Sequence, residues 1–170
     1  ASIMWLNKYF AKIINPYLTI INSLPKVALG PILIIWFGSG IKSIIIMALL
    51  ISTIITIINI YEAFITVDPI KIKLLNSLKA SKLYIYKNLI LPSSRDVILN
   101  TLIINVSMSL IGVIMGEFLV SKEGIGYLIM YGSQIFNLNL VISGIIILCI
   151  IASLMYSSII RIEKKLKSNK

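Results

Sequence analysis

The sequence predicts an all-α membrane protein, a polytopic bundle of transmembrane helices, on three observations. Of its 170 residues, 58% are hydrophobic and 13% are charged, whereas soluble domains are about 45–50% apolar and about 25% charged. No charged residue occurs in 43–61, 97–116 or 124–160, and a helix needs roughly 20 apolar residues to span a bilayer core. These runs also lack the alternating polarity of a membrane β-barrel strand.

Composition excludes several classes of function. The chain has no His, and Cys149 is its single Cys, so neither a disulfide framework nor a Cys/His zinc site is expected. No GxxxxGK[ST] loop for ATP phosphates is present. The net charge of +10 could indicate nucleic acid, but aromatic residues are not interleaved with the basic ones, which instead flank the apolar runs. We therefore expect no catalytic residue, no metal, no cofactor and no nucleic-acid partner.

A single domain covering residues 1–170 is expected to hold four spans, at about residues 18–37, 41–64, 95–119 and 138–160. Pro25, Gly30 and Pro31 interrupt the first of them. Because proline removes a helix donor and kinks the helix, we expect a broken span there. Residues 1–15 resemble the end of a preceding span followed by a turn at the membrane surface.

Orientation follows from the Lys and Arg residues, which concentrate on the cytoplasmic side of membrane proteins. The insert at residues 67–96, which follows the second expected span, and the C-terminal tail are rich in Lys and Arg. The loops expected on the opposite side of the membrane carry only Lys42 and Lys122. We therefore expect the insert, the 7–12 turn and both ends to be cytoplasmic. The basic residues of the insert and tail are Lys71, Lys73, Lys79, Lys82, Lys87, Arg95, Arg161, Lys164, Lys165, Lys167 and Lys170.

The insert predicts two short helices. Asp68 is a favourable N-cap, and Pro69 suits the first helical position. Ser81 can cap a second helix that runs up to Pro92. One apolar stripe repeats at helical spacing on the first helix, formed by Ile70, Leu74 and Leu78. Such a pair is either a docking surface or an interfacial loop held by anionic lipid, and the residues alone leave both open.

Three segments, in order, resemble binding-protein-dependent ABC transporter permeases of the nitrate, sulfonate and taurine type. "NSLPKVALGPILIIWFGSG" (22–40) is similar to their proline-rich span. "VDPIKIKLLNSLKASKLYIYKNLILPSS" (67–94) is similar to their cytoplasmic EAA loop, and "IGVIMGEFLVSKEGIGYLI" (111–129) to their Glu-Phe-Leu and Gly-x-Gly-Tyr-Leu segment. Members of this family begin with one or two further spans, so we expect that the N-terminal span or spans are lacking here.

The resemblance implies the membrane-spanning subunit of an ABC importer in the cytoplasmic membrane, which translocates a small solute and is not an enzyme. The implied partners are an ABC ATPase subunit, an extracytoplasmic solute-binding protein, a second permease subunit as a homodimer, and membrane lipid. The 67–92 loop would seat in the ATPase and couple it to the spans.

Within that loop, this sequence departs from the family at two places. The Glu-Ala-Ala falls on Lys73-Leu74-Leu75, and the family's Gly falls on Lys79. A left-handed backbone at Lys79 would cost about 1–2 kcal/mol, unless the turn adopts another geometry. The implied coupling residues, matching or altered, are Lys73, Leu74, Leu78, Lys79, Ala80, Ser81, Leu91 and Pro92.

Four polar residues within the expected spans are candidates for lining a translocation pathway: Asn59, Asn105, Ser109 and Glu117. Ser and Asn more often hydrogen-bond neighbouring membrane helices. A carboxylate at mid-bilayer costs about 2.5–3.5 kcal/mol, so Glu117, near the outer end of its span, is equally a structural or a gating residue. Gly112 and Gly116 form a GxxxG spacing, a sign of close helix packing that could lie at a dimer seam.

Two other classes of function remain as alternatives to the importer subunit. One is a secondary transporter or channel, in which the insert lines a vestibule, and the other is a membrane scaffold without a transport role. Secondary transporters usually show internal repeats and charges at the midplane, and neither is evident in this sequence.

Overall fold

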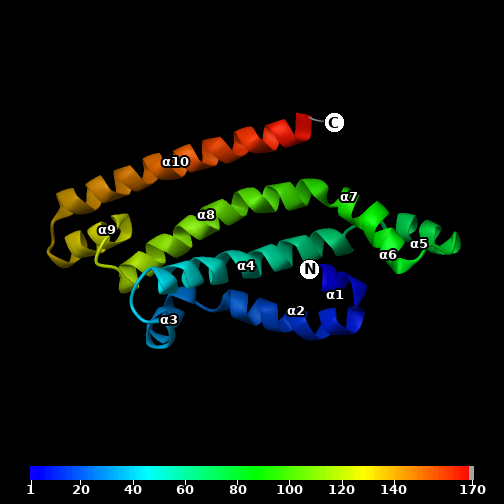
Figure 1. Ribbon diagram of the computed structural model, residues 1–170, viewed down its shortest axis with the longest axis horizontal. Coiled ribbons are helices and arrows are strands. Elements are labelled where there is room, and N and C mark those ends of the chain that lie inside the picture. The colour runs from blue at the N-terminus through cyan, green and yellow to red at the C-terminus, as the bar shows by residue number, and fades with distance from the viewer. Residues whose placement is uncertain (169–170) are drawn as a thin grey trace. The chain divides into compact units, whose positions relative to one another are not determined.

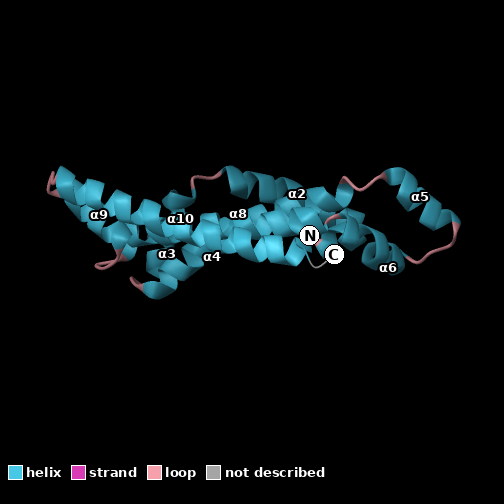
Figure 2. Cartoon of the chain, turned by 90° about the horizontal axis from the view of Figure 1, so that it is seen from above, coloured by secondary structure: helices cyan, strands magenta, loops and turns pink. Residues whose placement is uncertain are grey.

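The computed structural model describes the backbone of residues 1–168 and the side chains of residues 1–161. Every regular element within these residues is a helix (Figure 2), which confirms the all-α prediction. Of the cationic tail, Lys164, Lys165 and Lys167 have side chains outside the described residues, and Lys170 lies outside them altogether.

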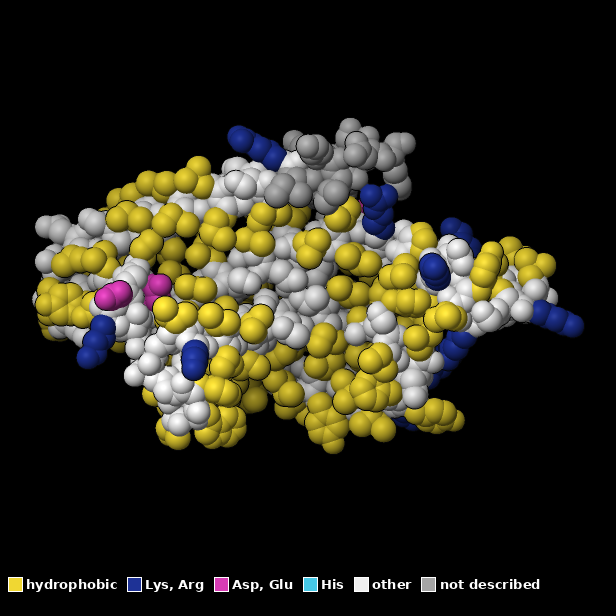
Figure 3. All heavy atoms as spheres, viewed as in Figure 1, with side chains coloured by type: hydrophobic (Ala, Val, Ile, Leu, Met, Phe, Trp, Pro, Cys, Tyr) yellow, Lys and Arg dark blue, Asp and Glu magenta, His cyan; other side chains and the backbone are white. Residues whose placement is uncertain are grey.

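Three long helices are apolar enough to cross a membrane: α4 (Ile41–Ile65), α8 (Arg95–Val120) and the Leu138–Arg161 part of α10 (Leu138–Ser168). Their bounds lie within a residue or two of three of the ranges expected from the sequence. Large apolar side chains are exposed along them, and yellow hydrophobic atoms cover much of the surface in Figure 3. A helix that is apolar on all sides is stable where lipid replaces water around it.

The segment before α4 differs from its prediction. Two helices, α1 (Ser2–Leu6) and α2 (Lys8–Ser23), occupy the stretch expected to end a span and turn at 7–12. Asn7 is the reason, because its Oδ1 accepts the N–H groups of Tyr9 and Phe10, both at 3.1 Å, and so caps α2 at once. The helix that leads into the first expected span therefore begins at Lys8, ten residues before residue 18.

The expected break in that span is present. α2 stops before Leu24 and Pro25, and the chain continues as the 3₁₀ helix η1 (Lys26–Leu29) and as α3 (Gly30–Phe37). Pro25 caps η1, and Pro31 lies in the first turn of α3, where its missing N–H costs no hydrogen bond. Counting this pair as one broken span raises the number of candidate spans among the described residues from three to four.

The chain divides into two compact units, Ala1–Ser23 with Ile54–Leu102 and Leu24–Thr53 with Ile103–Lys170. In the first unit, Phe64, Ile85 and Ile90 form a core in which each side chain is at most 2% exposed. This core joins the end of α4 to the helices that follow it. Those helices are α5 (Pro69–Ser77), α6 (Lys82–Ile85), the π-helical η2 (Tyr86–Ile90) and α7 (Leu91–Ser93), as Figure 1 shows.

The second unit packs around Leu33, Met47 and Ile51. There the GxxxG pair brings α8 against α4, because a Cβ built at Gly116 would lie 2.9 Å from the Cα of Ile44, and one at Gly112 would lie 3.1 Å from the Cβ of Ala48. Close packing by Gly112 and Gly116 is therefore confirmed, but its partner is α4 of the same chain rather than a dimer seam. α9 (Ile125–Gln134) packs against the start of α10.

Candidate functional site: the loop between α4 and α8

The loop between α4 and α8 begins with a capped helix. Asp68 accepts the N–H of Ile70 at 2.8 Å, and Pro69 follows in the first turn of α5. The carboxylate satisfies one of the donors that a helix start leaves unpaired, and proline has no donor to leave unpaired there. Both residues lie where the sequence predicts them.

The turn after α5 is closed by a left-handed residue. Lys79 has φ of 58°, its N–H bonds to the carbonyl of Asn76 at 2.9 Å, and the N–H of Ala80 bonds to Leu75 at 3.0 Å. This is the Schellman arrangement, in which glycine is the usual left-handed residue. Of the two outcomes expected for Lys79, the chain therefore keeps the turn and accepts a cost of about 1–2 kcal/mol.

The second helix starts at the predicted cap and then widens. Ser81 Oγ accepts the N–H of Tyr84 at 3.2 Å, and α6 continues without a break through η2 into α7. Pro92 has no N–H for the carbonyl one turn earlier, and a π turn is one of the adjustments by which helices accommodate proline. The predicted helix up to Pro92 is thus present, with a π segment that the sequence did not indicate.

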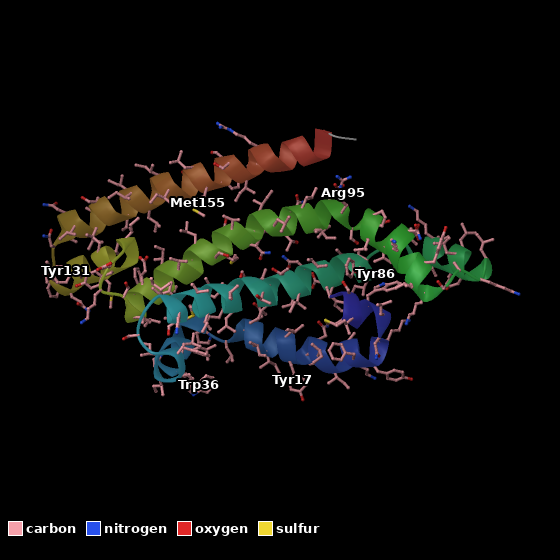
Figure 4. All side chains as sticks on the ribbon, viewed as in Figure 1. Tyr17, Trp36, Tyr86, Arg95, Tyr131 and Met155 are labelled. Atoms are coloured by element: carbon pink, nitrogen blue, oxygen red, sulfur yellow. The ribbon has the colours of Figure 1, made fainter. Side chains whose placement is uncertain are left out.

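Tyr86 ties this second helix to both neighbours in its unit. Its ring centroid lies 5.7 Å from that of Phe64 on α4, edge to face, and 5.6 Å from that of Trp5 on α1. Its hydroxyl donates to Ser2 Oγ at 2.7 Å, and Figure 4 shows the side chain between the helices. Ser94 adds a hydrogen bond from its Oγ to the carbonyl of Ala63 at 3.3 Å. These contacts anchor the loop to the end of α4 and to α1.

The opposite side of the loop exposes apolar side chains. Leu74 is 61% and Leu78 is 70% exposed, and in Figure 3 hydrophobic and basic side chains alternate over this part of the chain. Leu78 also lines a shallow hollow of about 340 Å³ between the two helices. The outward apolar surface, which we call the docking face, consists of Ile70, Leu74, Leu78, Leu83 and Tyr84. Exposed apolar side chains outside the long helices are compatible with contact either with a partner protein or with the membrane interface.

The residues implied by the resemblance divide between this face and the core. Ser81 and Lys79 shape the turn, Ala80 and Leu91 pack against the Phe64 core, and Pro92 and Lys73 are exposed. Their role in coupling stays a prediction.

Lys82 has a contact that sequence reasoning missed. Its ammonium group donates to the carbonyl of Leu6, at the end of α1, at 2.6 Å. The sequence indicated only an exposed lysine, because the two residues are separated by 76 positions and no local pattern links them.

The candidate pathway residues lie on α4 and α8, and the structure assigns one of them a structural contact. Glu117 Oε2 accepts the N–H of Gly126, in the first turn of α9, at 2.6 Å. A Cβ at Gly126 would lie 2.8 Å from the Cβ of Glu117, so glycine is required for this approach. The carboxylate also complements the positive end of the α9 dipole. These contacts support the structural role for Glu117, and a pathway role for Asn59, Asn105, Ser109 and Glu117 stays a prediction.

Within the described residues, no group of three or more His, Cys, Asp or Glu side chains could hold a metal ion. The loop instead presents a pair of short helices. One side of the pair packs on the Phe64 core, and the other side exposes apolar side chains.

The chain belongs to the family described as "Binding-protein-dependent transport system inner membrane component", whose model matches residues 1–168. The members of this family are transport permease subunits of membranes, as the resemblance of the three segments implies.

The sequence identity between this chain and individual relatives is low. The chain is 28% identical over 159 residues, 94% of its length, to a "Probable ABC transporter permease protein" of Haemophilus influenzae. It is 27% identical over 161 residues, 95% of its length, to a formylaminopyrimidine transport permease protein of Halalkalibacterium halodurans. It is 24% identical over 163 residues, 96% of its length, to a taurine transport system permease protein of Escherichia coli. The chain spans 65%, 64% and 59% of these relatives, respectively.

Replacing Lys79 with glycine should stabilise the turn. Lys79→Gly removes the left-handed strain, and the greater freedom of glycine in the unfolded chain offsets part of the gain. The net gain in the stability of the turn should be about 1 kcal/mol. Hydrogen exchange of the backbone amides of residues 79 and 80 should therefore slow about fivefold. Lys73→Gly, inside α5, is the control with the opposite sign, since it should cost about 1 kcal/mol. Faster hydrogen exchange in Lys79→Gly would show that the backbone of Lys79 is not strained.

Removing the carboxylate of Glu117 should destabilise the start of α9. Glu117→Ala should cost about 1.5–3 kcal/mol, the range for a hydrogen bond to a charged group, whereas Glu117→Gln keeps an acceptor and should cost less. Thermal unfolding in detergent measures both, and the exposed Glu123→Ala is the control, expected within about 0.5 kcal/mol of the unaltered chain. If Glu117→Ala unfolds at the same temperature as the control, the contact is not structural.

Proposed function

We propose that this chain is the permease subunit of an ABC importer and that it receives the ATPase motion through the docking face. The observation that carries the proposal is the two-sided loop: Tyr86 and Ile85 anchor one side to α4 and α1, while Leu74 and Leu78 expose the other. Membership of the family supports the class of protein, a transport permease subunit. The anchored and exposed sides of the loop support its role as the element that contacts the ATPase.

Anchoring is what a coupling element requires. A rigid-body displacement is transmitted only if the element that receives it is packed against the element that must move. The core of Phe64, Ile85 and Ile90 supplies that packing within the unit. A loop held only by lipid would not need a fully buried core beneath it, so the contacts favour docking over the interfacial alternative.

The proposed partners follow from this role. An ATPase subunit would cover the docking face, an extracytoplasmic solute-binding protein would deliver the solute, and a second copy of the permease would complete the pathway as a homodimer. Because the family's Glu is replaced by the exposed Lys73, we propose that the ATPase cleft carries an acidic group opposite it.

The solute is proposed only as a class. Relatives are named for taurine, aliphatic sulfonates, riboflavin and formylaminopyrimidine. The proposal is therefore a small solute of the nitrate, sulfonate or taurine kind or a related nutrient. The chain would work in the cytoplasmic membrane, with the loop and the C-terminus on the cytoplasmic side, since both are rich in Lys and Arg.

A charge placed on the docking face tests the coupling role. Leu78→Asp should abolish co-purification with the ATPase and stop uptake, because burying a leucine contributes roughly 1.5–3 kcal/mol and an unpaired buried charge costs more. Lys71→Asp is the matched control: it introduces the same residue at an exposed site in the first turn of α5, where an acidic group is favourable, and should change binding by about 0–1 kcal/mol. Membrane insertion should survive in both, as the changes lie outside the long helices. An intact ATPase complex with Leu78→Asp would refute docking.

Cysteine labelling tests the orientation. In a Cys149→Ala background, Lys122→Cys should react with an impermeant maleimide on intact cells, and Lys73→Cys only after the membrane is opened. Both positions are exposed in this chain, so in cells that lack the proposed ATPase subunit access depends on the side of the membrane. The reverse labelling would invert the proposed topology.

A further inference from the structure

A cavity of about 630 Å³ lies within the first unit, between α1 and α2 on one side and the end of α4 with the loop on the other. It is separate from the docking face, none of whose five residues lines it. Its volume is in the range of pockets for small organic ligands, about 300–1,000 Å³.

The mouth of the cavity is cationic. Lys8 and Lys12 are four residues apart on α2, so they lie on the same face of the helix, and Lys82 approaches from α6. No Asp or Glu is among the lining residues. Lys82 spends one donor on the carbonyl of Leu6, and an ammonium group has three. Three lysines among the lining residues, without a lining carboxylate, favour an anion.

The floor of the cavity is apolar. Trp5 is partly exposed and Ile65 is 56% exposed there, while Met4 and Phe64, which also line the cavity, are almost completely buried. Bare phosphate would satisfy the lysines and leave this floor in contact with water. A molecule with a phosphate at one end and hydrocarbon at the other satisfies both parts at once, and a membrane provides that molecule in excess.

The geometry points to a binding site for the headgroup of an anionic phospholipid, with the phosphate between Lys8, Lys12 and Lys82 and the glycerol and first acyl carbons over Trp5 and Ile65. The site does not depend on the proposed function. If that function holds, the lipid would connect α2 to α5 and α6, because Asn76 and Lys82 of the loop line the cavity, and the coupling loop would be stiffer in acidic membranes.

Trp5 provides a direct readout, since the chain has only two Trp residues and Trp36 lies outside the cavity. In a Trp36→Phe background, reconstituted in bilayers, quenching of Trp5 by brominated phosphatidylglycerol is compared with quenching by brominated phosphatidylcholine. A site of this kind should prefer the anionic lipid about fivefold or more, since each lysine near an anionic lipid contributes about that factor.

Matched variants separate the site from general surface charge. Lys8→Gln with Lys12→Gln should lower the preference about fivefold or more and leave at most the contribution of Lys82, whereas Lys71→Gln with Lys73→Gln on α5 removes the same charge outside the cavity and should leave the preference unchanged. Equal quenching by both lipids, or a preference that the Lys8 and Lys12 changes do not lower, would overturn the site. Equal quenching by both lipids together with a change in Trp5 emission on adding soluble glycerol phosphate would overturn the lipid as ligand and identify a water-soluble phosphate in its place.

Discussion

The packing of Tyr86 and the Phe64, Ile85 and Ile90 core is the constraint on which the loop between α4 and α8 depends. Fully buried apolar side chains contribute about 1.5–3 kcal/mol each, and here they join α4 to a helix more than twenty residues further along the chain. Without that core, α5 and α6 would be isolated helices of nine and four residues. Isolated helices of fewer than about 12–15 residues are marginally stable in water. The anchoring also determines which side of the pair is left to face a partner.

The turn at Lys79 decides the direction of the second helix. Its left-handed backbone closes α5 with two hydrogen bonds and delivers Ser81 to the position where it caps α6. A lysine in that conformation costs about 1–2 kcal/mol, and the contacts of Leu75 and Ala80 with the core offset the cost. Strain of this kind persists only where the surrounding packing over-determines it.

Local and distant contacts contribute differently to the predictability of this molecule. Asp68 and Ser81 accept backbone N–H groups two and three residues away, and Pro69 acts through its own missing N–H, so their roles follow from the sequence. Asn7 acts over the same distance, yet its cap was missed because the basic residues beside it suggested a surface turn. The contacts of Lys82 with Leu6 and of Glu117 with Gly126 cross between elements, and no periodicity or capping rule indicates them.

The sequence by itself determined the helical membrane class, the ranges of the three long helices, the break near Pro25 and the two capped helices of the loop. These follow from hydrophobicity, from proline and from capping, which are properties of a residue and its immediate neighbours. Only the tertiary structure decided that Gly112 and Gly116 face α4 of the same chain, that Glu117 caps α9, and that three lysines surround one cavity. Each of these depends on which helix faces which. That choice is made by the fit of side chains over the whole unit, and a pattern read along one segment does not contain it.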